Sequence, residues 1–287
     1  MSVKTFRQLV ESINELPAMP RVAQELLLLR TNVDANASDL ARIIKMDPSL
    51  SAQVVRYANS PLYRYQGEIR NIQDAIARVL GHGVVMDMAI GVSLGRTLQM
   101  PDSGPLGLSG FWQNAVYTAV LTQRLGKLME PVKQPQAGLA YLCGLLHNFG
   151  FLVLGHMFRN QFNVLGKAVM SNPDVPVNDV EKHVLGMTHM EIGEWILAAW
   201  QLPVEVLTVV REHHMPDYDG EYYKYANLVL LADRLQGGYD IIGRMQQQIP
   251  EAVTERLGLD VEKVMQVFAD TREERTAMDT LAVQMAA

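Results

Sequence analysis

The chain has 287 residues, of which 48% are hydrophobic, and its formal net charge is −6. This length is sufficient for one large domain or two small ones with a sizeable core. The acidic excess, with no run of Lys or Arg, argues against non-specific binding of nucleic acid, because that binding needs cations to neutralise phosphates. The single cysteine, Cys143, excludes an internal disulfide and suits a reducing cytoplasm.

No segment is interpreted as a signal for export or membrane insertion. Polar residues interrupt the N-terminal segment Met1–Leu16 at every second or third position, so it has no apolar signal core. Apolar runs such as Ala226–Ala232 are too short to span a bilayer. We therefore expect a cytoplasmic protein that does not bind membranes.

The dominant period in the first third of the chain is helical. Apolar residues recur on one helical face over Val3–Ile13 and again over Val22–Leu29. Asp47-Pro48 places a capping residue before a proline at a first helical position. Asn71, followed by Asp74, predicts a cap in front of a helix over Ala75–Leu80. We find no run of alternating β-branched residues between turn clusters, so strands are not expected.

Gly and Pro divide the remainder of the chain. Met100–Gly110 predicts a linker or exposed loop between two helical halves, and Ser171–Val177 predicts a second break. Pro203 is expected to start a helix, and Gly237-Gly238 to stop one. The charged stretch Asp270–Gln284 predicts a solvated peripheral helix, with a partner-docking helix as the alternative.

Gly91–Gly95 reads GVSLG and formally matches the G-x-S-x-G turn that carries a nucleophilic serine. That turn requires a preceding strand. Here the match lies in a helical run over Val84–Leu98. We therefore interpret its small residues as a contact between two helices.

Histidines are concentrated in the second half of the chain. Six of the seven lie between residues 147 and 214, namely His147, His156, His183, His189, His213 and His214. Neutral imidazole suits transition metals, and nearby acids can complete such a site; those acids are Glu191, Glu194, Glu212 and Asp233. Because no H-E-x-x-H spacing occurs, any metal site must be assembled from helices distant in sequence.

Gly144–Gly150 reads GLLHNFG and resembles the G-L-L-H-D-[IL]-G motif of the HD phosphohydrolase superfamily. Further segments resemble the HDOD family, the HD-related output domain of bacterial signalling proteins: LPAMP at Leu16–Pro20, IIKMDPSL at Ile43–Leu50, ANSPLY at Ala58–Tyr63, IRNIQDAIARVLG at Ile69–Gly81, FWQNA at Phe111–Ala115, GMTHMEIG at Gly186–Gly193, WQLP at Trp200–Pro203, and His213-His214. Several of these motifs have a structural interpretation, with Asn59-Ser60-Pro61 stopping a helix and Trp200 fixing a packed corner.

The resemblance implies an all-α fold and a signalling role in which catalysis is usually lost. It implies an N-terminal helical bundle over residues 1–105. An HD-like helical half with a C-terminal helical extension would follow over residues 106–287.

Active HD enzymes use the His-Asp pair, other histidines and a late Asp as metal ligands. By position, His147 matches the retained His, Asn148 replaces the Asp, and Asn114 stands where an upstream His is expected. The resemblance also places four downstream residues at metal-binding positions, His189, His213, His214 and Asp233. Asn has a neutral oxygen, which is a weaker ligand than carboxylate and cannot bridge two cations.

The two asparagines favour a non-catalytic signalling module over an enzyme. We expect it to bind a protein partner or a small signalling ligand and to carry a degenerate HD metal site. The alternative is a metal-dependent phosphohydrolase acting on a nucleotide or cyclic dinucleotide. No cofactor is expected. An intermediate possibility is a protein that binds one divalent metal ion without catalysing hydrolysis. The sequence does not define the partner or the oligomeric state.

Overall fold

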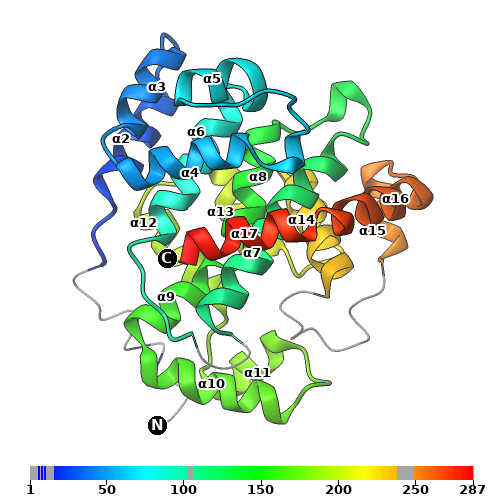
Figure 1. Ribbon diagram of the computed structural model, residues 1–287. Helices are drawn as coiled ribbons and strands as arrows, with labels where there is room; N and C mark the ends of the chain where they lie inside the picture. The colour runs from blue at the N-terminus through cyan, green and yellow to red at the C-terminus, as the bar shows by residue number, and fades with distance from the viewer. Residues whose placement is uncertain are drawn as a thin grey trace.

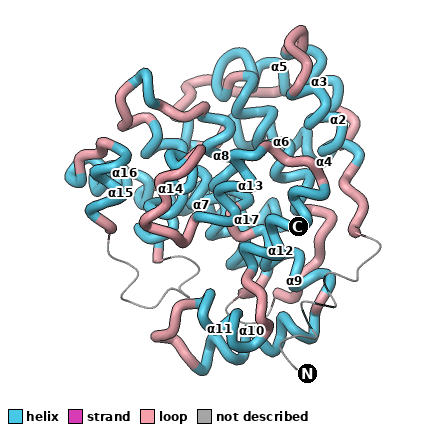
Figure 2. The backbone as a smooth tube through the Cα atoms, turned by 180° about the vertical axis from the view of Figure 1, so that it is seen from behind, coloured by secondary structure: helices cyan, strands magenta, loops and turns pink. Residues whose placement is uncertain are grey.

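The computed structural model describes residues 6, 8, 10, 16–102, 106–237 and 249–286. Among them no strand occurs, so the expected all-α fold is confirmed (Figure 2). The N-terminal third contains α2 (Arg21–Arg30), α3 (Ala37–Ile44), α4 (Pro48–Ala58), η1 (Pro61–Tyr63), α5 (Ile72–Asp74), η2 (Ala75–Leu80) and α6 (His82–Gly95). The middle contains α7 (Leu108–Gly126), η3 (Pro131–Lys133), α8 (Ala137–Leu146), α9 (Phe149–Met157), α10 (Arg159–Ser171), α11 (Val177–Val184), α12 (His189–Ala199), α13 (Val204–Glu212) and α14 (Tyr223–Gln236). The chain ends with α15 (Glu251–Leu257), α16 (Val261–Glu273) and α17 (Arg275–Ala286).

The helix boundaries follow the capping residues read from the sequence. The Asp47 carboxylate accepts hydrogen bonds from Ser49 N and Leu50 N at 2.9 and 3.0 Å, and α4 begins at Pro48. The side chain of Asn71 likewise accepts from Asp74 N at 2.8 Å. The segment Ala75–Leu80 that follows is a π-helix instead of the α-helix expected. α13 starts directly after Pro203, as predicted.

Glycines allow the central helices to approach closely. A methyl group built on Gly144 of α8 would lie 2.6 Å from the Cα atom of Ala119 in α7. On α6, methyl groups at Gly91 and Gly95 would meet side chains of Leu145 and Trp112 at 2.5 and 2.2 Å. Gly91–Gly95 is therefore a helix–helix contact, as the sequence indicated.

One hydrophobic cluster runs through both predicted halves of the chain, from Phe6 to Met285. α2–α5 lie at one end of the molecule and α10–α11 at the opposite end, with α6, α7 and α8 between them (Figure 1). α7 begins at Leu108, so the last residues of the loop expected over Met100–Gly110 are helical. The division at residues 105 and 106 stays a prediction.

The C-terminal helices differ from the expected single peripheral helix. Glu274 interrupts Asp270–Gln284, and α16 and α17 form on either side of it. α17 crosses α7 (Figure 1) and buries its apolar residues Met278, Leu281, Ala282 and Met285. The expectation of a solvated helix was wrong because these residues share one helical face that packs on the core.

Trp200 fixes a corner between two distant family motifs. Its side chain is buried, and its Nε1 donates a hydrogen bond to Pro17 O at 3.1 Å. Gln201, the next residue, has a φ of 57° and turns the chain towards Pro203. The WQLP and LPAMP segments therefore contact each other and stabilise this corner of the fold.

One described stretch, Ala137–Met157, is long and apolar enough to cross a membrane, with a mean hydropathy of 1.6. In the fold 94% of its most apolar window is buried, and the turn at His147-Asn148 divides it into α8 and α9. It is therefore part of the hydrophobic core.

Candidate metal centre

The seven predicted site residues come from five parts of the fold and lie in one cluster. His147 and Asn148 form the turn between α8 and α9, and His189 is the first residue of α12. His213 and His214 follow α13. Asn114 lies on α7 and Asp233 on α14, and both side chains are buried.

A close approach of two helices brings His147 and His189 into this cluster. Gly150 of α9 has its backbone against α12, where an added methyl group would lie 1.8 Å from His189 O and 2.9 Å from Gly193 N. Only glycine allows this contact. The two glycines of GLLHNFG thus position the turn that carries His147, Gly144 against α7 and Gly150 against α12.

Two histidines have their hydrogen positions fixed by backbone carbonyls. His147 Nδ1 lies 2.7 Å from Gly144 O. His213 Nδ1 lies 3.1 and 3.0 Å from the carbonyl oxygens of Val209 and Val210. Because a carbonyl only accepts hydrogen bonds, each Nδ1 carries the hydrogen in the neutral ring, and each Nε2 presents a lone pair.

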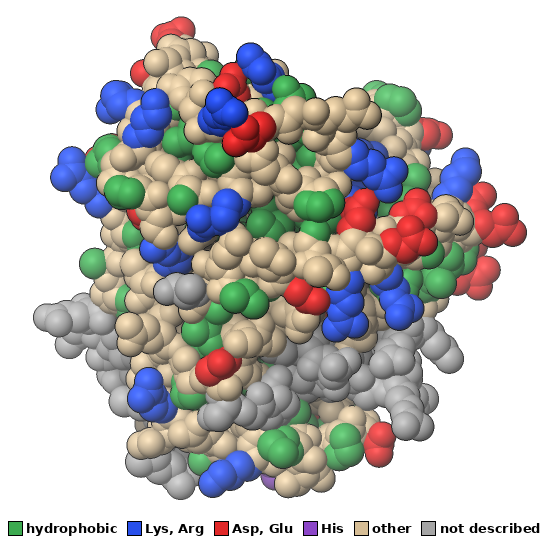
Figure 3. Space-filling view, viewed as in Figure 1, with side chains coloured by type: hydrophobic (Ala, Val, Ile, Leu, Met, Phe, Trp, Pro, Cys, Tyr) green, Lys and Arg blue, Asp and Glu red, His purple; other side chains and the backbone are tan. Residues whose placement is uncertain are grey.

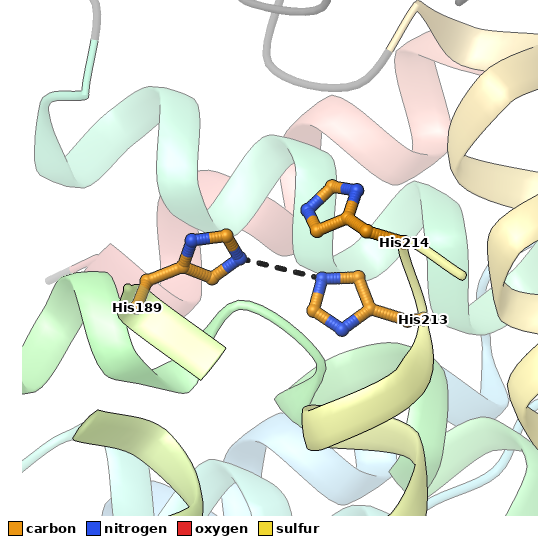
Figure 4. Close-up of side chains that lie close together, drawn as sticks. All are labelled: His189, His213 and His214. Atoms are coloured by element: carbon orange, nitrogen blue, oxygen red, sulfur yellow. Dashed lines mark hydrogen bonds between the residues drawn. The ribbon is translucent and has the colours of Figure 1, made fainter. Parts of the chain in front are cut away.

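The Nε2 atoms of His189 and His213 face each other at 3.4 Å (Figure 4). His214 lies next to this pair, with its ring centroid 4.2 Å from that of His213. One ring nitrogen from each of the three histidines lies within 4.8 Å of the others. The ring of His147 makes an edge contact with that of His213, at a centroid distance of 5.1 Å.

Amide side chains orient the carboxylate of Asp233. Asn114 Nδ2 donates to Asp233 Oδ1 at 3.1 Å, and Asn148 Nδ2 donates to Asn114 Oδ1 at 3.1 Å. His147 Nε2 lies 3.5 Å from the same Asp233 oxygen, which is longer than a normal hydrogen bond. The two asparagines thus form a hydrogen-bonded chain that ends on the carboxylate.

Burial sets the charge states in the cluster. It lowers the pKa of His189 to about 3, aided by the neighbouring His147, and it lowers the pKa values of His213 and His214 as well. Burial by itself would raise the pKa of Asp233, but His147 and the Asn114 hydrogen bond bring it below its ordinary value. At neutral pH these three imidazoles are neutral and Asp233 is an anion, which are the forms that bind a metal.

These donors fit one divalent transition metal ion. His147 Nε2, His214 Nε2 and Asn148 Oδ1 are buried without a hydrogen-bond partner, which normally costs free energy. Imidazole nitrogens with one carboxylate suit ions such as Zn²⁺, Co²⁺, Ni²⁺ and Fe²⁺. A second cation would lack the bridging carboxylate, because Asn148 is neutral.

The other polar residues considered from the sequence lie outside the cluster. His183 is exposed on α11, and His156 Nδ1 accepts a hydrogen bond from Gln99 N. Among the acids, Glu191 caps α12 with Thr188, while Glu194 and Glu212 both pair with Arg211. Of the four acids, Asp233 lies beside the histidines, with its Oδ1 3.5 Å from His147 Nε2.

Glu181, a wholly buried acid on α11, was not predicted from the sequence as a site residue. Its carboxylate oxygens lie 3.0 and 2.9 Å from His189 Nδ1. A signal was present, because Glu181 occupies the apolar helical face formed by Val177, Val180 and Val184. A charged residue on such a face indicates a buried partner.

The protein is all-α, and the seven residues that the HD resemblance named lie in one cluster. The HDOD domain family model matches residues 16–216, and the chain belongs to this family. Asp233 lies beyond the matched region.

Known structures share this fold. A protein of Marinobacter aquaeolei VT8, whose name proposes a role in signal transduction, is 32% identical, with a TM-score of 0.85 over 99% of this chain and 66% of that one. An HDOD domain protein of unknown function from Geobacter sulfurreducens is 22% identical, with a TM-score of 0.76 and 97% of each chain covered. A curated relative from Treponema pallidum, which is uncharacterized, is 26% identical over 78% of this chain. The chain spans 42% of that relative's length.

Proposed function

We propose that this chain is a non-catalytic HDOD signalling module that binds one divalent transition metal ion and acts through a protein partner or a small signalling ligand. The ion is held by His189, His213 and His214, whose ring nitrogens lie within 4.8 Å of one another, together with His147 and Asp233. The metal site is supported by buried ring nitrogens that lie close together and have no N–H or O–H group to bind their lone pairs. A cation shared by these nitrogens removes the repulsion between their lone pairs.

The role of the ion in this proposal is structural. The cation would cross-link four parts of the fold, because its ligands lie on the α8–α9 turn, α12, α14 and the end of α13. The amide chain from Asn148 through Asn114 holds the Asp233 oxygen in place. Binding to the folded state alone stabilises that state, so metal occupancy and the packing of these helices are coupled.

Two features argue against hydrolysis. The charge that an Asp would supply at position 148 is missing, which weakens any second metal position. His147 and His189 are 0% exposed, so a phosphate group has no direct access to their ring nitrogens. A metal-dependent phosphohydrolase remains the second candidate, supported by the retained histidines and Asp233.

Surface charge supports a protein or small-molecule partner over nucleic acid. On the face in Figure 3 the described Lys and Arg side chains are interspersed with Asp and Glu and form no continuous basic surface. Nucleic-acid binding depends on such a surface. The proposal includes a cytoplasmic location, which suits the single buried thiol of Cys143.

Metal titration of chelator-treated protein tests the proposal. Zn²⁺, Co²⁺, Ni²⁺, Mn²⁺ and Fe²⁺ are each added while thermal unfolding is followed, and bound metal is measured by elemental analysis. We expect one ion per chain and a rise in Tm that corresponds to about 2.7 kcal/mol of added stability at a hundredfold excess over Kd. His147→Ala should abolish this rise.

The same preparations are assayed with a generic phosphodiester, nucleotides and cyclic dinucleotides. We expect no turnover with any metal. Turnover that disappears in His147→Ala would favour the phosphohydrolase instead. An unchanged Tm with every metal would contradict the metal site. The double variant Asn148→Asp with Asn114→His is expected to bind a second metal equivalent if the site has lost its two-metal chemistry through these two positions.

A further inference from the structure

We propose that Glu181 is a positioning residue that holds His189 in the tautomer able to bind metal. This inference rests on the proposed metal site. His189 is the one histidine of the Nε2 pair whose Nδ1 does not face a backbone carbonyl. Its Nδ1 faces the Glu181 carboxylate, and neither residue has any exposed surface.

Glu181 and Phe151 together fix the ring of His189. Glu181 Oε1 accepts from the backbone N of His189 at 3.1 Å and lies 3.0 Å from its Nδ1, while Oε2 lies 2.9 Å from Nδ1. Phe151 stacks on the ring, with a centroid distance of 4.2 Å and an interplanar angle of 15°. The stacking sets the plane of the ring, and the carboxylate sets its rotation.

A metal ligand at His189 Nε2 requires the hydrogen on Nδ1. An imidazole with its hydrogen on Nε2 would direct that hydrogen at His213 Nε2, 3.4 Å away, and block the ion. Burial raises the pKa of Glu181, and the hydrogen bond from the His189 backbone N–H opposes that rise by stabilising the carboxylate. As a carboxylate, Glu181 accepts from Nδ1, which stabilises the required tautomer and makes Nε2 a stronger ligand. Glu181 thus does for His189 what the carbonyl oxygens of Gly144, Val209 and Val210 do for His147 and His213.

Glu181→Gln separates this role from simple packing. The His189 backbone N–H only donates, so the amide of the variant must turn its oxygen towards that N–H. The amide NH₂ then takes the place of Oε2 and donates to Nδ1. This reverses the hydrogen bond and moves the ring hydrogen to Nε2. The substitution keeps side-chain size, and it selects the tautomer that does not bind metal.

The test compares wild type, Glu181→Gln and a matched control, Asp87→Asn. Asp87 is also a buried acid, but it lies on α6 and pairs with Arg30 at 3.3 Å. Co²⁺ affinity is measured from its visible absorption, and the Zn²⁺ affinity by competition. We expect Glu181→Gln to bind each metal 10- to 100-fold more weakly, the typical effect of losing such a partner. Asp87→Asn should bind within about twofold of wild type.

Nitrogen NMR of the histidine rings gives a readout that a merely structural role would not change. In Zn²⁺-loaded wild type we expect the His189 hydrogen on Nδ1, and in Glu181→Gln we expect it on Nε2. The wild-type spectrum tests the inference even if the variant does not fold. Equal metal affinity in Glu181→Gln and wild type, or a wild-type His189 bound through Nδ1, would overturn the role of Glu181 alone. Failure of wild type to bind either metal would overturn the metal site and this inference together.

Discussion

Gly150→Ala should destabilise the protein strongly and disturb the histidine cluster. The added methyl group would lie 1.8 Å from His189 O and 2.6 Å from His189 C, and Gly193 N is 2.9 Å away. Ordinary contacts begin at 3.4 Å, so α9 and α12 must separate by roughly 1.5 Å. The obstacles are backbone atoms of a packed helix, which cannot move aside as a flexible side chain can.

The expected cost follows from this geometry. Overpacking a core typically costs about 1–3 kcal/mol, and backbone obstacles on both sides place this site at the upper end, about 3 kcal/mol. Because about 1 kcal/mol shifts the Tm of a protein of this size by roughly 2–4 °C, we expect a fall of about 6–12 °C. The separation also moves His189 away from His147, so Co²⁺ binding should weaken in the folded variant.

Gly166→Ala is the matched control. Gly166 lies inside α10, and a methyl group there meets nothing within 4 Å. Replacing a helical glycine by alanine in open space should stabilise by about 0.5–1 kcal/mol. Both variants are measured by urea and thermal unfolding in chelator. A Gly150→Ala protein as stable as wild type, or the same sign of change in both variants, would refute the packing argument.

Three further predictions concern stability elsewhere in the fold. Burial raises the pKa of Asp87 to about 6, above its ordinary 3.8. Ionising Asp87 therefore lowers the stability of the folded wild type progressively as the pH rises from about 4 to just above 6, and has little further effect at higher pH. The stability of Asp87→Asn relative to wild type should therefore rise by about 2.4 kcal/mol from pH 4 to pH 7, and urea unfolding at each pH checks this; a pH-independent difference would contradict it. Trp200→Phe removes the hydrogen bond to Pro17 O and should cost about 1 kcal/mol, measured as a lower urea midpoint, unless the corner is held by packing alone. Asp47→Ala removes the cap of α4 and its contact with Arg96, and we expect a loss of about 1 kcal/mol in the same assay; no loss would mean that solvent satisfies the exposed N–H groups equally well.

Local features of the fold could be predicted from the sequence because their causes lie within a few residues. Asp47 and Asn71 cap helices through their own neighbours, and Pro203 starts one for the same reason. The expected fate of Asp270–Gln284 was wrong, since burial of its apolar face depends on α7, more than a hundred residues away. The hydropathic stretch Ala137–Met157 shows the same limit, because only the fold reveals what covers it.

The candidate site likewise has features that the sequence predicts and features that only the tertiary structure shows. The motifs named seven residues, and the tertiary structure places all seven side chains in one cluster, although sequence spacing gives no distance between helices. The family resemblance already separated these histidines from His156 and His183, and the structure gives those two histidines other neighbours. The structure alone adds Glu181, whose function depends on a ring nitrogen eight positions along the chain and on the loop between. The sequence by itself determined which side chains carry metal-binding chemistry; the packing of α9 against α12 at Gly150 determined which of their atoms meet.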